Sequence, residues 1–172
     1  MLFDQRDFYM SGAAEITTDA QWMQKAIHAA LEAQSEGEVP VGACIVSSGK
    51  LLAVAGNRTR RDNDPTAHAE IVALRAAANT LGNYRLTEAV VYSTIEPCAM
   101  CAGALIQARV KRLVYGAPDV KAGAVESRFA ICNTDFLNHR IQVTARVMER
   151  ECCELMQQFF RGRREMNQQI EG

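Results

Sequence analysis

The sequence has no apolar run that approaches the roughly 18 residues needed to cross a bilayer, so no membrane-spanning helix is expected. Its first residues, MLFDQRDFYMSGAAEI, lack the basic start and apolar stretch of a signal peptide. Internal repeats, low-complexity tracts and linkers rich in proline or glycine are also missing. We therefore expect a cytoplasmic protein without a membrane partner.

The chain also carries almost no net charge, −1 over 172 residues, so its overall field gives no sign of a polyanionic partner. Any nucleic-acid surface must be local. Six cysteines without an export signal indicate a reducing compartment, where thiols bind metals or pack in the core. The length fits one domain, and we predict a loose arm over residues 1–17 followed by a single domain over 18–172.

The hydrophobic pattern predicts alternating helices and strands. Thr18 and Gln21 form a capping-box pattern at the start of an amphipathic helix that ends near Gly37. Beyond it we predict a hairpin over 41–57, helices over 65–81 and 98–107, strands over 89–94, 112–117 and 141–147, and a final helix from Met148. This order is typical of an α/β fold with a mixed sheet covered on both faces. In such sheets the site lies beyond the carboxyl ends of the strands.

Two short windows, PTAHAEIVAL at 65–74 and EPCAMC at 96–101, contain residues suited to metal chemistry. His68, Cys98 and Cys101 supply three zinc ligands and leave a fourth position for water, as catalytic zinc sites do. Glu70 is the candidate base that takes a proton from that water. Because His68 and Glu70 would point nearly opposite ways inside a helix, we expect both in its first turn, with the metal beyond the helix end.

Other interpretations of these residues stay open at this point. The C-x-x-C pair alone could be a redox site. A structural zinc site would take Cys44 or Cys132 as a fourth ligand, and all the residues could simply pack in the core. The combination of H-A-E with P-C-x-x-C at two predicted helix starts favours the catalytic interpretation more than either motif alone.

The pattern H-x-E followed by P-C-x-x-C is the known signature of zinc nucleobase deaminases, adenine-acting members included. The chain further resembles the bacterial tRNA-specific adenosine deaminase family over roughly residues 20–165, for example in GNRTRRDNDPTAHAEIVALR, NYRL and TIEPCAMCAGALIQARVKRLVYGAPDVKAGA. The resemblance implies a cytidine deaminase-like, three-layer α/β/α sandwich with a mixed five-stranded sheet. It also implies a homodimer, with one Zn²⁺ per subunit, that converts the wobble adenosine of a tRNA anticodon to inosine. The arginine tRNA with an ACG anticodon is the substrate implied.

The resemblance carries roles onto individual residues. It makes His68, Cys98 and Cys101 the zinc ligands and Glu70 the proton shuttle. Nucleotide contacts are implied for Asn57, for the pocket wall at Pro40, Val41 and Gly42, and for Asp119. We expect the backbone N–H of Cys98 to stabilise the oxygen that forms on the base. The chain departs from the family at Pro118, where a basic residue is usual, and over 125–137.

Positive charge gathers at two places that could rim such a pocket. Arg58, Arg60 and Arg61 precede the metal-binding helix, and Arg161, Arg163 and Arg164 follow Phe159 and Phe160. We select Phe160 and Arg163 as RNA contacts, since an anticodon stem-loop offers unstacked bases and phosphates. The alternative is a solvated loop and an ordinary basic helix end.

Two rival functions share part of this evidence. One is a deaminase of free cytosine, cytidine or guanine, which would need the same metal chemistry but not the arginine clusters. The other is a non-catalytic RNA-binding module with a structural zinc. Glu70 argues against the second, because a closed metal site needs no proton shuttle.

Overall fold

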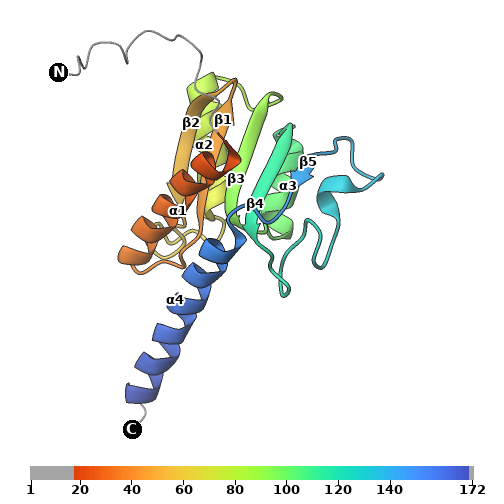
Figure 1. Cartoon of the computed structure of the whole chain (residues 1–172). Helices are drawn as coiled ribbons and strands as arrows, with labels where there is room; N and C mark the ends of the chain where they lie inside the picture. The colour runs from red at the N-terminus through yellow and green to blue at the C-terminus, as the bar shows by residue number, and fades with distance from the viewer. Residues whose placement is uncertain (1–17, 171–172) are drawn as a thin grey trace, which may run out of the picture.

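The computed structural model describes residues 18–170, so the predicted arm over 1–17 lies outside the described residues. Within this part of the chain, one five-stranded sheet is covered by helices on both faces (Figure 1). The elements in chain order are α1 (Asp19–Ser35), β1 (Gly42–Ser47), β2 (Lys50–Gly56), α2 (Ala69–Leu81), β3 (Ala89–Ile95), α3 (Ala99–Gln107), β4 (Arg112–Ala117), a 3₁₀ turn (Ile131–Asn133), β5 (Gln142–Thr144) and α4 (Glu149–Ile170).

The strand order is β2-β1-β3-β4-β5. β1 pairs antiparallel with both β2 and β3, whereas β3, β4 and β5 run parallel. It follows that β2, β3 and β4 all end at the same edge of the sheet. The predicted α/β/α sandwich with a mixed five-stranded sheet is confirmed, and its chemistry is expected at this edge.

Successive side chains of β1 point to opposite faces of the sheet, and each face is covered by a hydrophobic layer. Cys44 and Val46 face the layer of α1 and α4, where Trp22 and Met23 pack. Ala43 and Ile45 face the opposite layer, in which buried residues of α2 and α3 lie. α4 starts against the sheet and then projects beyond the edge where β2, β3 and β4 end (Figure 1).

A close approach of α1 fixes the start of β1. A Cβ atom at Gly42 would lie 1.9 Å from the carbonyl oxygen of Ala26, so no larger residue fits there. The amide of Gly42 also donates a hydrogen bond to the Thr94 hydroxyl at 3.1 Å. The segment that precedes β1 is therefore held against β3, next to the edge that carries the site.

Helix α1 begins as predicted, with the Thr18–Gln21 capping box formed, but the start of α2 was predicted wrongly. The helix begins at Ala69 and not at Pro65. The Asp64 carboxylate accepts bonds from the amide and hydroxyl of Thr66, at 2.8 and 2.7 Å, and forms a turn there. His68 is consequently the residue before the helix, in an extended conformation with φ −67° and ψ 153°.

Strand β5 is also shorter than the predicted 141–147. It ends at Thr144, and the backbone then turns through positive φ values of 66° at Arg146 and 53° at Met148. This left-handed conformation cannot continue an extended strand. The final helix follows immediately, close to the predicted position.

The described helices include none with both the length and the hydropathy to cross a membrane.

Asp19 ties the first helix to the sheet. Its carboxylate accepts a hydrogen bond from the Tyr92 hydroxyl on β3 at 2.9 Å and two from the Arg112 guanidinium on β4, at 3.1 and 2.6 Å. Burial alone would raise the pKa of Asp19, but these hydrogen bonds and the charge of Arg112 hold it below its usual value. The ionised form of Asp19 is therefore favoured in the folded protein.

We predict that Asp19→Asn lowers the free energy of unfolding by about 2 kcal/mol at pH 7, since charge-assisted hydrogen bonds are lost. The folded pKa of Asp19 lies below its unfolded value of about 3.9. The difference between wild type and variant should therefore persist above about pH 4 and shrink as the pH falls through the folded pKa. Urea unfolding followed by circular dichroism between pH 3 and 7 measures it.

Glu88→Gln is the matched control, because its pair with Lys111 is exposed and contributes little. If the difference in free energy of unfolding between wild type and Asp19→Asn stays constant down to pH 3, the proposed role of the Asp19 charge is wrong.

Candidate active site

Two helix starts bring the predicted ligands together at the edge where β2 and β3 end. His68 is the N-cap residue of α2 and Cys98 the N-cap residue of α3, and neither side chain caps its own helix. The His68 Nδ1 atom lies 3.6 Å from the Cys98 sulfur and 3.5 Å from the Cys101 sulfur. The three donor atoms are thus within reach of one central ion.

The spacing fits tetrahedral zinc. Zn–S bonds of about 2.3 Å and Zn–N bonds of about 2.0–2.1 Å, at a tetrahedral angle, separate nitrogen from sulfur by about 3.5 Å. Among the residues that the structure describes, no other His, Cys, Asp or Glu joins this group. Three protein ligands leave one position open, which is the arrangement of a catalytic zinc site rather than a structural one.

The alternative fourth ligands lie elsewhere. Cys44 is buried in the layer of α1, and Cys132 is buried in the layer of α2 and α3. Burial raises the pKa of each of these thiols to about 12, and neither belongs to the group of donor atoms that could hold one ion. Neither cysteine supports the structural-zinc interpretation.

The ligand cysteines differ in their proton affinity. Hydrogen bonds from Cys101 and His68 lower the pKa of Cys98 to about 3, so this thiol is ionised. The hydrogen bond to Cys98, together with burial, raises the pKa of Cys101. A metal ion binds both cysteines as thiolates, so its binding releases protons from this pair.

Asn57, which follows β2, bonds to the first residue of α2. Its Oδ1 atom accepts a hydrogen bond from the Ala69 amide at 2.9 Å. The amide of Asn57 in turn donates to the Val41 carbonyl at 3.0 Å. Asn57 thereby satisfies one free amide of the first turn of α2, next to His68.

Glu70 lies in the first turn of α2 and is only 2% exposed. Its Oε2 atom is 3.6 Å from the Cys101 sulfur, and its Oε1 atom is 3.2 Å from the Ser93 hydroxyl. Burial raises the pKa of Glu70. A carboxylate beside the metal ligands whose neutral form is favoured is suited to taking up and releasing protons.

Three polar residues of the site were not predicted from the sequence. Ser93 contacts Glu70, and it also donates to the Ile95 carbonyl at 2.7 Å. Glu38 and Glu96 are each 1% exposed and accept bonds from the backbone of distant loops. For Glu38 and Glu96 the sequence did offer a signal, because each is the single charged residue in an otherwise mostly apolar stretch, GEVPVG and TIEPC respectively.

The predicted nucleotide contacts fall into two groups. Pro40, Val41 and Gly42 lead into β1, directly beside Asn57. Asp119 and Phe160 line a groove of about 630 Å³ between the loop after β4 and α4; the other residues of the groove are Ile95, Lys121, Met156, Gln157, Arg161 and Arg164. Arg163 is absent from this groove, and its guanidinium stacks on the Phe159 ring at 5.1 Å.

The arginines before α2 are engaged with local partners. Arg60 donates to the Gly37 carbonyl, and Arg61 pairs with Glu36 and Asp62. The side chains of Arg60 and Arg61 nevertheless stay exposed to solvent.

Comparison with known proteins adds to this geometry. Residues 16–117 match the family model of the cytidine and deoxycytidylate deaminase zinc-binding region. A tRNA-specific adenosine deaminase of Haemophilus influenzae is 45% identical over 148 residues, which cover 86% of each chain.

Two solved structures are also similar. One comes from a study of A-to-I editing by tRNA:A34 deaminases at the wobble position of transfer RNA. It has a TM-score of 0.76 and 45% identity, over 78% of this chain and 97% of that one. The other is guanine deaminase from Bacillus subtilis, with a TM-score of 0.59 and 38% identity over 66% of this chain and 71% of that one.

We predict that His68→Ala reduces bound zinc from one ion per chain to less than about one tenth, because two thiolates alone do not complete the site. Cys132→Ala should retain the full ion, since that thiol lies in the core away from the three ligands. Elemental analysis of the purified proteins measures both. Zinc loss in Cys132→Ala, with the fold intact by circular dichroism, would instead favour a site closed by four ligands.

Proposed function

The chain belongs to the tRNA-specific adenosine deaminase family of zinc-dependent deaminases, and we propose that it converts the wobble adenosine of the arginine tRNA with an ACG anticodon to inosine. In this reaction water adds its oxygen to C6 of the adenine, the C6–N bond breaks and ammonia leaves. The observation that carries the proposal is the buried Glu70 carboxylate beside a cluster of only three metal ligands. The identity to curated tRNA deaminases supports the choice of substrate.

Zinc held by His68, Cys98 and Cys101 would supply the Lewis acid that makes water nucleophilic near neutral pH. Glu70 takes a proton from the attacking water and gives it to N1 of the ring. Glu70 then takes the remaining proton from the new hydroxyl on C6 and passes it to the amino group, which leaves as ammonia. The Ser93 hydroxyl, 3.2 Å from Glu70, keeps the carboxylate turned toward the ligands. The backbone N–H of Cys98, at the start of α3, donates to the oxygen that forms on C6.

Asn57 and the pocket wall hold the base. The Oδ1 atom of Asn57 is used by the Ala69 amide, so its NH₂ group is directed toward the base and ribose. Val41 and Gly42 form the wall with Pro40, and the bond from the Asn57 amide to Val41 keeps the wall and the asparagine together. A splayed-out base would enter between them.

The groove between the loop after β4 and α4 would take the flanking nucleotides. Phe160 is 44% exposed, enough to offer its ring to a base, and Arg161, Arg164 and Lys121 can reach phosphates. Arg163, which lies on the same turn of the helix as Arg161 and Arg164, contributes positive charge and stacks on Phe159. An enzyme for free bases has no need of this groove.

We also propose that the chain works as a homodimer in the cytoplasm, where tRNA is available. Support for the dimer is an apolar groove of about 410 Å³ on the outer face of α2 and α3, lined by Ile71, Leu74, Ala78, Tyr84, Leu86 and Ala104 among others. Burial of such a patch against a second copy is favourable.

We predict that the purified chain converts the wobble adenosine of an ACG anticodon stem-loop to inosine. Glu70→Gln should lower kcat by about 1,000-fold, because the amide cannot shuttle protons. Nucleoside analysis of the digested RNA measures inosine, and elemental analysis should find zinc unchanged in the variant.

Free guanine, guanosine and cytidine serve as comparison substrates. Turnover of guanine with no inosine in the RNA would replace the proposal with the guanine deaminase function of the Bacillus subtilis relative. Near-normal turnover by Glu70→Gln would refute the shuttle.

We predict that the double reversal Arg161→Glu with Arg164→Glu weakens binding of the stem-loop at least tenfold in 0.1 M salt. It should also reduce the slope of log Kd against log salt by about 1–2, as phosphate contacts are lost. Fluorescence anisotropy with labelled RNA measures both quantities. Lys50→Glu is the control, at the first residue of β2, at the opposite edge of the sheet from the groove. An unchanged slope in the double variant would remove these arginines from the RNA surface.

A further inference from the structure

Glu96 lies between the end of β3 and the zinc-ligand turn at Pro97 and Cys98, and the mechanism above does not use it. Its carboxylate is 1% exposed and accepts five hydrogen bonds, all from the segment 119–127. The Oε1 atom accepts from the amides of Val125, Glu126 and Ser127, at 3.1, 2.8 and 2.8 Å. The Oε2 atom accepts from the Asp119 amide at 3.0 Å and from the Ser127 hydroxyl. One side chain therefore holds both ends of this loop.

The same loop is fastened to the backbone of the zinc-ligand turn. The Ala124 amide donates to the Pro97 carbonyl at 2.8 Å, and Gly123 forms an isolated antiparallel bridge with Cys98. A Cβ atom at Gly123 would lie 2.4 Å from the Glu96 carboxyl carbon and 2.5 Å from the Asp119 carbonyl oxygen. The loop can close over Glu96 only because this position is glycine.

What the loop presents to the outside is one wall of the groove beside α4. Asp119 and Lys121 line the groove opposite Phe160, Arg161 and Arg164. The Asp119 Oδ1 atom accepts from the amides of Lys121 and Ala122, at 3.0 and 3.1 Å, so the aspartate is locked within its own turn. The position of that turn depends on the bond from the Asp119 amide to Glu96.

We propose that Glu96 is a positioning residue for the RNA substrate, which fixes the groove wall at Asp119 and Lys121 relative to the zinc-ligand turn at Cys98. The proposal rests on the proposed function, because it assigns the groove to the nucleotides that flank the target adenosine. Through Glu96, the nucleotide next to the target is held at a set distance from the metal, and the adenine enters the pocket in the correct position.

Only a carboxylate meets the demands of this position. Five donors converge on two oxygens, and both oxygens must act as acceptors. A glutamine has one acceptor oxygen and turns an NH₂ group toward the remaining donors. If the glutamine oxygen accepts from the three amides of 125–127, the glutamine NH₂ group lies against the Asp119 amide. Both groups are donors, so no hydrogen bond forms between them. Glu96→Gln is therefore expected to release the Asp119 end of the loop while it keeps the other end.

The experiment compares hydrogen–deuterium exchange and steady-state kinetics of the zinc-loaded enzyme with and without Glu96→Gln. Exchange of peptides that contain Asp119 should become faster, and zinc content should stay at one ion per chain. KM for the ACG stem-loop should rise about tenfold, the equivalent of one lost charge-assisted hydrogen bond, with kcat within about threefold of wild type.

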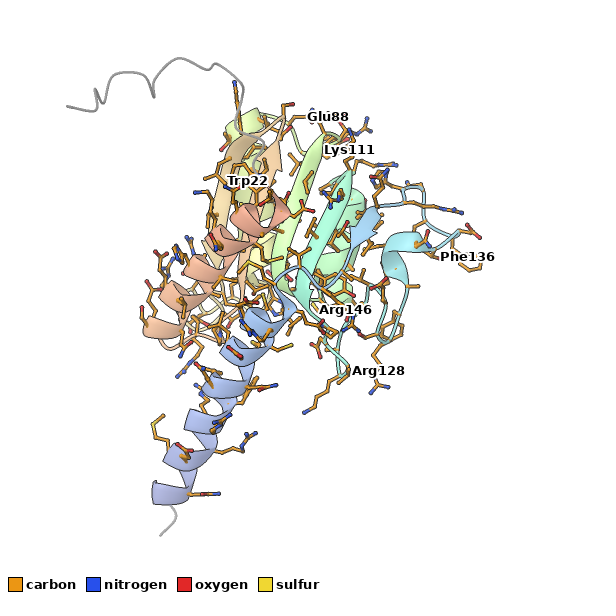
Figure 2. All side chains as sticks on the ribbon, viewed as in Figure 1. Trp22, Glu88, Lys111, Arg128, Phe136 and Arg146 are labelled. Carbon is orange, nitrogen blue, oxygen red and sulfur yellow. The ribbon has the colours of Figure 1, made fainter. Side chains whose placement is uncertain are left out.

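Two matched variants separate this role from a general loss of stability. Glu38→Gln alters a second loop-holding carboxylate, which is also buried and accepts from the amides of Arg60 and Arg61 at 2.8 Å each. It should speed exchange around residues 59–61 and leave that of 119–127 unchanged. Glu88→Gln makes the same chemical change at an exposed site and should alter neither region; Glu88 and Lys111 lie at the opposite end of the sheet from Arg128 and Arg146 (Figure 2).

If Glu96→Gln does not fold, Ser127→Ala removes one donor to the carboxylate and should raise KM by about two- to threefold. An unchanged KM, or a fall in kcat alone, would overturn the proposal, as would unchanged exchange over 119–127. A wild-type chain that leaves the RNA unmodified would instead refute the proposed function, whereas the exchange comparison would still decide whether Glu96 anchors the loop.

Discussion

The site depends on the convergence of three donor atoms from two different helix starts. His68 and Cys98 each occupy an N-cap position, where a side chain would ordinarily bond to its own helix, yet neither does so. In α2, the Asn57 side chain accepts from the Ala69 amide, one of the N–H groups that the first turn leaves free, and the imidazole lies beside the two cysteines. Since β2 and β3 end at the same edge of the sheet, the helices that follow them bring the histidine and both cysteines to one point.

Three buried glutamates near this edge illustrate how surroundings decide a carboxylate's role. Glu38 accepts from the amides of Arg60 and Arg61 and so holds a loop in place. At Glu96, hydrogen bonds from Ser127 and the loop amides outweigh burial and hold the pKa below its usual value, so this carboxylate stays ionised and holds its loop in place. Burial dominates at Glu70 and raises its pKa, so that carboxylate can exchange protons during a reaction.

Much of this could be predicted from the sequence, because the informative signals are local. The Thr18–Gln21 capping box, the alternation along the strands and the spacing of His68, Cys98 and Cys101 depend on neighbours in the chain. The start of α2 was missed because Asp64-Pro65-Thr66 resembles a helix start but forms a turn. The function of Glu96 could not be predicted, since its partners lie 23 to 31 positions away and are backbone amides that carry no sequence signature.

The most direct test of the account is the X-ray absorption spectrum of the zinc-loaded enzyme at the zinc edge. Two sulfurs at about 2.3 Å and two lighter atoms at about 2.0–2.1 Å are expected, the latter being one imidazole nitrogen and one water oxygen. In a Cys132→Ala sample the spectrum should be the same. A third sulfur in the first shell, or a spectrum that changes in that variant, would contradict an open catalytic site formed by His68, Cys98 and Cys101.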